Sequence, residues 1–174
     1  GKAEMGNIAA SATSKKRRWR KLLVWLLIDT GVTVAVIVLL LYKPSAYRPI
    51  KALMHEPGQV HPYLTHLSSQ LYNSAQLRKP FVIVIEQEPI NQVISQADWP
   101  KESGEILLYA PAAVFKPGRL ILMGTAKVKG VELVVTFVLQ PVFDAQGRIN
   151  LEVTAVRVGA MNLTPLAKMI AKKM

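Results

Sequence analysis

Three histidines within a short stretch are the first residues of this chain that could do chemistry. His55, His61 and His66 carry imidazole nitrogens, which are common metal ligands. His61 and His66 are five positions apart, which on a helix turns their side chains about 140° away from each other. No pair of carboxylates is interleaved with them. The chain has no cysteine, which excludes a thiolate zinc site, a cysteine nucleophile and a disulfide framework. We therefore expect neither a metal site nor another cofactor.

Acidic side chains are the next candidates, because paired carboxylates can perform general acid and base catalysis. Glu86, Glu88 and Asp98 are the closest approach to such a set, but they are more simply explained as charges at the ends of a strand and a helix. The chain has no nucleophile elbow and no glycine-rich phosphate loop after a strand, and residues 144–147 form a turn signal rather than a calcium loop. The sequence predicts a protein that is not an enzyme.

One apolar block dominates the organisation of the chain. Residues 22–42 contain a single formal charge, and as a helix they would span about 30 Å, the thickness of the hydrocarbon core of a bilayer. A buried core helix of this length would show a polar stripe, and this block shows none. A cleaved signal peptide has a shorter apolar region, and the KPSAYRP that follows is a poor cleavage site. We expect a retained transmembrane helix.

Polar and small residues inside this block predict that it docks against another helix. Asp29 is a costly residue at membrane depth unless it is neutral or finds a partner. Gly31 and Ala35 present a small-xxx-small surface, and Thr30 and Thr33 can add hydrogen bonds between helices. Small residues are also common in membrane helices that have no partner, so the pattern leaves both alternatives open.

A basic segment precedes the apolar block and predicts its orientation. Residues 1–21 hold seven Lys or Arg and one Glu, whereas only Lys43, Arg48 and Lys51 follow closely after the block. By the positive-inside rule, the N-terminus lies in the cytoplasm and the C-terminal part outside it, across the inner (cytoplasmic) membrane. Much of the formal net charge of +11 comes from this flank, and residues 43–174 carry the rest without a dense basic run, so we expect contact with lipid head groups rather than nucleic acid. The residues assigned to topology and head groups are Lys15, Lys16, Arg17, Arg18, Arg20 and Lys21.

The remaining sequence predicts one α+β domain at residues 62–174, after a tail at 1–21, the membrane helix at 22–42 and a proline-punctuated connector at 43–61. Residues 1–14 show no apolar period and predict a mobile part of the tail. Residues 62–77 predict an amphipathic helix that starts after His61. Residues 81–85 predict a strand buried on both faces. A second helix should begin at Pro89 and stop by Pro100.

From residue 105 onward, turn signals at regular intervals predict an antiparallel β-meander. In the longest strand, Val131, Leu133, Val135, Phe137 and Leu139 alternate with Glu132, Thr136 and Gln140. This alternation predicts one apolar face, covered by two or three short helices, and one wet face. Thr164 and Pro165 should open a final helix.

The order of these elements resembles a known group of families. A strand is followed by Glu88-Pro89-Ile90-Asn91-Gln92-Val93-Ile94, then by a meander that ends in Val158-Gly159 and an Asn-Leu-Thr-Pro helix start. Over about residues 81–170 this resembles the YpmS-like proteins and, more distantly, the LmeA-type and BPI-like tubular lipid-binding domains. The resemblance implies an anchored or exported bacterial protein with a curved sheet, an apolar groove, and binding of lipid or another hydrophobic ligand.

Two functions follow from these expectations. The first is a membrane-anchored domain that binds lipid in an apolar groove, and the second is an accessory subunit of a larger membrane protein complex. An open groove and a closed core both fit the alternation. If a groove exists, we expect it to be lined by Phe81, Ile83, Ile90, Ile94, Leu133, Val135, Phe137, Leu151 and Val153.

Overall fold

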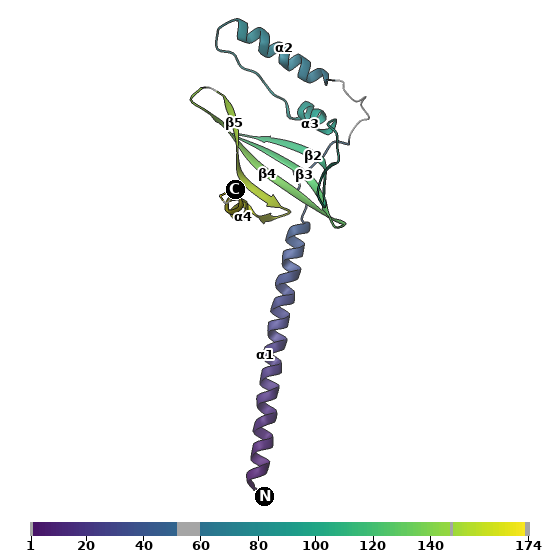
Figure 1. Ribbon diagram of the computed structural model, residues 1–174, viewed down its shortest axis with the longest axis vertical. Coiled ribbons are helices and arrows are strands. Elements are labelled where there is room, and N and C mark those ends of the chain that lie inside the picture. The colour runs from purple at the N-terminus through teal and green to yellow at the C-terminus, as the bar shows by residue number, and fades with distance from the viewer. Residues whose placement is uncertain (1, 52–59, 147, 173–174) are drawn as a thin grey trace. The chain divides into compact units, whose positions relative to one another are not determined.

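The computed structural model describes residues 2–51, 60–146 and 148–172, with side chains from residue 18 onward except that of residue 171. The chain divides into two compact units, Gly1–Leu39 and Leu40–Met174. The first is a single helix, and the second is an antiparallel sheet with short helices (Figure 1). The predicted α+β class with an N-terminal apolar helix is confirmed.

Helix α1 (Lys2–Leu41) contains the apolar block and ends shortly before Pro44, which cannot continue a helix. Its stretch Arg18–Leu41, 24 residues, is long and apolar enough to cross a membrane, and none of its most apolar window is buried against protein. The helix already begins at Lys2, so the segment expected to be a mobile tail is helical. Its many Ala, Lys and Arg residues have high intrinsic helix propensity.

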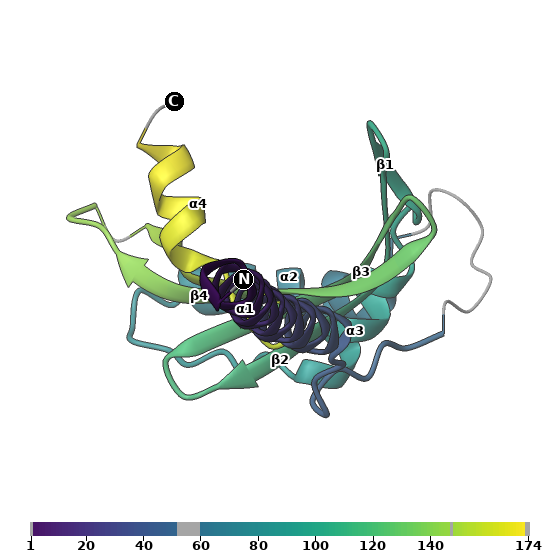
Figure 2. The ribbon, with the colours of Figure 1, turned by 90° about the horizontal axis from the view of Figure 1, so that it is seen from below.

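Six strands follow each other in the sheet in chain order, as the predicted meander requires. Gly118 and Gly130 have φ of 66° and 85° in the two tight turns, a backbone conformation that favours glycine. Figure 2 shows the sheet curving, with β1 and the last helix at its opposite ends. The strands are β1 (Lys101–Ser103), β2 (Ile106–Lys116), β3 (Arg119–Val128), β4 (Val131–Phe143), β5 (Ile149–Val158) and β6 (Met161–Asn162).

The strand predicted at residues 81–85 does not exist, and this prediction is wrong. These residues have no regular secondary structure, and Val82 is 86% exposed. The free edge of β2, where such a strand could pair, is occupied instead by helix α3 (Gln87–Ser95). This helix begins two residues before the predicted Pro89 and ends well before Pro100.

Two amides of α3 bind the β2 edge in place of a strand. Asn91 donates through Nδ2 to the carbonyl of Ala113 at 2.7 Å and accepts from the Ala113 N–H at 2.5 Å. One turn earlier, Gln87 Oε1 accepts from the N–H of Phe115 at 2.8 Å. The i, i+4 spacing of the amides matches the two-residue period of the strand, so α3 satisfies backbone groups that an edge strand leaves unpaired.

One face of the sheet is covered by the strap, which we define as residues 42–50 and which was expected to be part of a connector. Tyr47 donates its hydroxyl to the carbonyl of Ala110 at 2.6 Å and lies 2.8 Å from the hydroxyl of Thr125. Val134 and Thr136 on this covered face are 2% and 7% exposed. The prediction of a wet face on β4 is therefore wrong at Thr136, although Glu132 and Gln140 are exposed, because the alternation within a strand cannot show a distant segment that packs on it.

Two further helices flank the sheet. Helix α2 (Pro62–Gln76) begins after His61, as predicted, and His61 Nδ1 accepts from the N–H of Tyr63 at 3.1 Å. None of its residues is buried, so α2 does not cover the sheet. Helix α4 (Thr164–Ala171) opens at the predicted Thr164, whose hydroxyl accepts from the N–H of Val156 on β5 at 3.0 Å.

Candidate functional site: an apolar pocket on the open face

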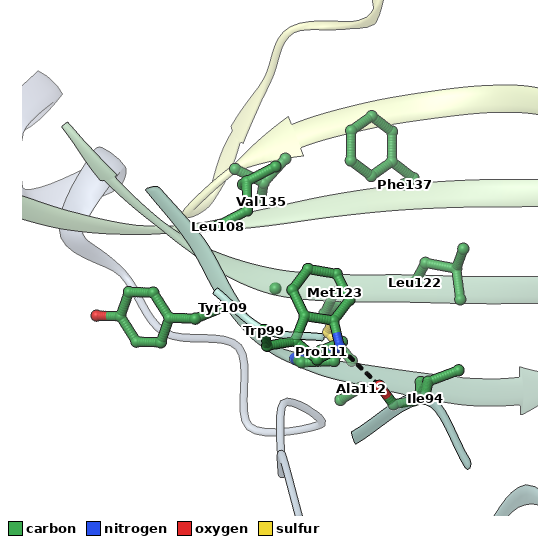
Figure 3. Close-up of a pocket in the computed structure, with 11 residues that line it drawn as sticks. Ile94, Trp99, Leu108, Tyr109, Pro111, Ala112, Leu122, Met123, Val135 and Phe137 are labelled. Atoms are coloured by element: carbon green, nitrogen blue, oxygen red, sulfur yellow. Dashed lines mark hydrogen bonds between the residues drawn. The ribbon is translucent and has the colours of Figure 1, made fainter. Parts of the chain in front are cut away.

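The face of the sheet opposite the strap, which we call the open face, carries a pocket with a volume of about 240 Å³ (Figure 3). Its walls come from three strands, α3 and the segment that follows α3. The lining residues are Ile94, Trp99, Leu108, Tyr109, Pro111, Ala112, Leu122, Met123, Gly124, Val135 and Phe137.

The strand register places the apolar side chains of this pocket side by side. Leu122 on β3 pairs with Phe137 on β4, and Gly124 pairs with Val135 two residues along. Neighbouring residues on adjacent strands point to the same face of a sheet, so these pairs form a continuous apolar surface. Gly124 has no side chain, which leaves the floor of the pocket at the level of the backbone.

Trp99 closes the pocket on the side of α3. Its indole N–H donates to the carbonyl of Ile94 at 2.6 Å (dashed line in Figure 3), so its one polar atom is satisfied and its ring can present an apolar surface. A bulge in β2 lies beside it, where Ala110, with φ of 51°, and Pro111 interrupt the pairing with β3. The pocket can therefore receive an apolar group without leaving a polar atom unpaired.

The structure places the predicted groove residues in four locations. Ile94, Val135 and Phe137 line the pocket. Ile90 lies half-buried in α3, and Leu133, Leu151 and Val153 lie on the open face outside the pocket. Phe81 and Ile83 belong to the irregular segment before α3 and do not line the pocket.

Several lining residues were not predicted. Leu122 could not be found by alternation, because it lies in a continuous apolar run at residues 120–123 of β3. Trp99 and Pro111 could not be found this way, since a loop and a bulge place them. The residues missed are Trp99, Leu108, Tyr109, Pro111, Ala112, Leu122, Met123 and Gly124.

Beyond the pocket, the open face continues as exposed apolar surface along the β4–β5 hairpin. Phe143 pairs with Ile149, and Pro141 pairs with Leu151. Phe143, Ile149 and Leu151 are 69%, 62% and 52% exposed. Large apolar side chains that stay exposed in neighbouring strands mark a binding surface more often than a solvated one.

The titratable groups with shifted pKa values lie away from the lining of this pocket or point out of it. A hydrogen bond with Glu132 raises the pKa of Tyr109 to about 12, and Figure 3 shows its hydroxyl directed away from the other lining side chains. Burial raises the pKa of Tyr47. At the β4–β5 turn, the backbone N–H of Arg148 lowers the pKa of Asp144, which it contacts at 2.8 Å. The pocket offers apolar contact and no acid or base.

The metal and acid candidates are also placed by the structure. Within residues 2–51, 60–146 and 148–172, no group of three His, Cys, Asp or Glu residues could hold a metal ion. His55 lies outside the described residues. Glu86 and Glu88 stand at the start of α3, where the helix dipole stabilises negative charge. Asp98 follows the end of this helix.

The residues predicted to dock α1 against another helix are exposed on the first unit. Asp29, Thr30, Gly31 and Ala35 are all exposed. The hydroxyl of Thr33 donates to the carbonyl of Asp29 at 2.8 Å, one turn back along the helix. Of the basic flank, Arg18, Arg20 and Lys21 are exposed, and Lys15, Lys16 and Arg17 are helical with side chains outside the described set.

Comparison with known proteins gives no relative for this chain. No protein-family model, no curated protein and no solved structure matches it. The resemblance to tubular lipid-binding domains therefore stays a prediction.

Proposed function

We propose that this protein is a single-pass membrane-anchored domain that binds lipid or another hydrophobic ligand on the open face of its sheet, without catalysis. The observation that carries the proposal is the pocket, whose lining is apolar and whose single indole N–H is already bonded. Apolar pockets with satisfied polar groups bind ligands through burial of apolar surface.

The apolar helix supports the anchoring half of the proposal. Arg18–Leu41 is long enough to span a bilayer, and the excess of Lys and Arg before it favours a cytoplasmic N-terminus. The domain then lies outside the cytoplasm, beside a membrane that supplies hydrophobic ligands.

A soluble brominated fatty acid tests the binding half, because bromine quenches tryptophan fluorescence at short range. Trp19 and Trp25 lie in α1, so Trp19→Phe together with Trp25→Phe leaves Trp99 as the only tryptophan. With the full chain held in amphipol, we expect saturable quenching of Trp99. Val135→Asp places a charge in the pocket lining and should abolish the quenching.

Val82→Asp is the matched control, because Val82 is exposed and does not line the pocket. In this variant the fluorescence of Trp99 should be quenched by the brominated fatty acid as strongly as in the parent protein. Absence of saturable quenching in the parent, or equal quenching in Val135→Asp and Val82→Asp, would contradict the proposal.

The second candidate is an accessory subunit of a membrane complex. Asp29 stands exposed within the apolar span, and a Cβ added at Gly31 meets nothing within 4 Å, which leaves this surface open for another helix. After gentle extraction, an accessory subunit should migrate with its companion, and Asp29→Leu should release it. Migration as a lone monomer, unchanged by Asp29→Leu, would contradict this candidate.

A further inference from the structure

A second pocket lies on the covered face, beneath the strap. Its volume is about 350 Å³. Tyr42 and Pro44 of the strap form part of its wall, and Gly159 and Ala160 of the β5–β6 turn form another part. Tyr42 directly follows Leu41, the last residue of α1, so this pocket includes the first residue of the domain after the apolar helix.

The pocket is basic. Lys116 at the end of β2 and Arg157 on β5 line it, and no acidic residue does. In the part of the chain that the structure describes, the ion pairs are Lys129–Glu105 and Arg148–Asp144. Neither Lys116 nor Arg157 is therefore neutralised by an ion pair within that part.

Thr136 adds a buried hydroxyl to the lining of this pocket. The residue is 7% exposed, and its Oγ1 has no hydrogen-bond partner among the described residues. Thr136 is the register partner of Arg157 on the neighbouring strand. A buried hydroxyl without a hydrogen-bond partner is unfavourable. A ligand that accepts a hydrogen bond from this hydroxyl would therefore stabilise the folded domain.

A phosphate group matches this combination of side chains. The guanidinium of an arginine binds the two charged oxygens of a phosphodiester at once, and each of these oxygens can accept a further hydrogen bond from a lysine or a hydroxyl. With the apolar helix in a membrane, Tyr42 stands where lipid head groups begin. We propose that this pocket binds the phosphate diester of an anionic phospholipid head group. This inference rests on the membrane span proposed above, but not on the apolar pocket.

Helix α4 supports a membrane surface at the same end of the domain, because it begins four residues after Ala160. Leu166, Met169 and Ile170 share one side of this helix and are exposed, and Lys168 and Lys172 are exposed on its other side. An amphipathic helix with a basic polar face is typical of a segment that lies on anionic lipid.

The test follows the threonine methyl resonance of Thr136 by NMR, in the full chain held in neutral maltoside micelles. The ligands are dihexanoyl phosphatidylglycerol, dihexanoyl phosphatidylcholine and inorganic phosphate. We expect a saturable shift that is tightest for phosphatidylglycerol. Lys116→Gln with Arg157→Gln should weaken that binding about tenfold or more, whereas Lys79→Gln with Lys101→Gln removes the same charge outside the pocket and should leave it unchanged.

Thr136→Val gives a second readout that separates a binding role from a structural one. It removes the unpaired hydroxyl at nearly constant shape, so the melting temperature should rise while the affinity for phosphatidylglycerol, followed in this variant by the methyl groups of Ile121, falls. Ile121 lines this pocket but not the pocket on the open face.

Three results would overturn the inference: no saturable shift with phosphatidylglycerol, equal affinity in the two double variants, or inorganic phosphate binding as tightly as the lipid. None of these results depends on whether brominated fatty acid quenches Trp99 on the open face. Conversely, a failure of that quenching would not change the titration with phosphatidylglycerol. The two proposals can therefore fail separately.

Discussion

The covered face and the open face of the sheet differ in exposure although apolar side chains alternate toward both. Val134 on the covered face of β4 is 2% exposed, and Val153 on the open face of β5 is 54% exposed. The difference comes from the strap, whose Tyr47 reaches Thr125 from 78 positions away in the sequence. Burial of Val134 thus depends on a segment that is remote in sequence, whereas the β4–β5 hairpin keeps large apolar side chains exposed on the open face.

The largest predicted effect separates the two faces directly. Val134→Asp buries an unpaired carboxylate and should destabilise the domain by more than about 4 kcal/mol. Val153→Asp, the same change on the open face, should alter the free energy of unfolding by about 0.5 kcal/mol. Urea unfolding of the full chain in micelles, followed by circular dichroism, measures both. Similar decreases in the free energy of unfolding for the two variants would show that Val153 is buried like Val134.

The second prediction concerns the edge of β2 that helix α3 occupies. Asn91→Leu removes both hydrogen bonds to the backbone of Ala113, which is 1% exposed, and should cost about 2–4 kcal/mol because each buried backbone group then lacks a partner. Gln92→Leu is the control on the next position of the same helix. The midpoint of urea unfolding compares them, and an Asn91→Leu midpoint equal to that of Gln92→Leu would mean that α3 does not hold the edge.

The smallest effect concerns Tyr109, whose raised pKa depends first on its hydrogen bond with Glu132. Glu132→Gln should lower the pKa of Tyr109 from about 12 toward its ordinary value of 10.0. Folding favours the protonated phenol, so its contribution to stability is complete below the unfolded value and is lost as the pH rises through about 12. NMR titration of the labelled tyrosine ring measures this pKa. An unchanged pKa in Glu132→Gln would exclude this hydrogen bond as the cause.

Local patterns in the sequence predicted the elements well. The apolar block gave a helix of membrane-spanning length, the turn signals gave the meander, and Thr164 with Pro165 gave the start of α4. Each of these depends on residues that are neighbours in the chain. The same local information identified Val135 and Phe137 as lining residues, because a strand alternates with a period of two.

What failed depended on packing between distant segments. Residues 81–85 look like a buried strand, yet the amides of Gln87 and Asn91 occupy the strand edge that would receive them. The alternation of β4 predicted that Thr136 faces solvent, but the strap packs on that face and Thr136 is buried. Trp99 enters the pocket from a segment without regular structure, where side-chain direction has no period.

The attachment of Tyr47 has a mechanical consequence. Tension drawn along residues 42–46 would reach the sheet first at the hydroxyl of Tyr47, which is bonded to Ala110 on β2 and Thr125 on β3. The load is then shared by the ladder between these two strands, and no terminal strand is peeled away. A pull on the apolar helix would therefore load the ladder between β2 and β3 before it reached either end strand of the sheet.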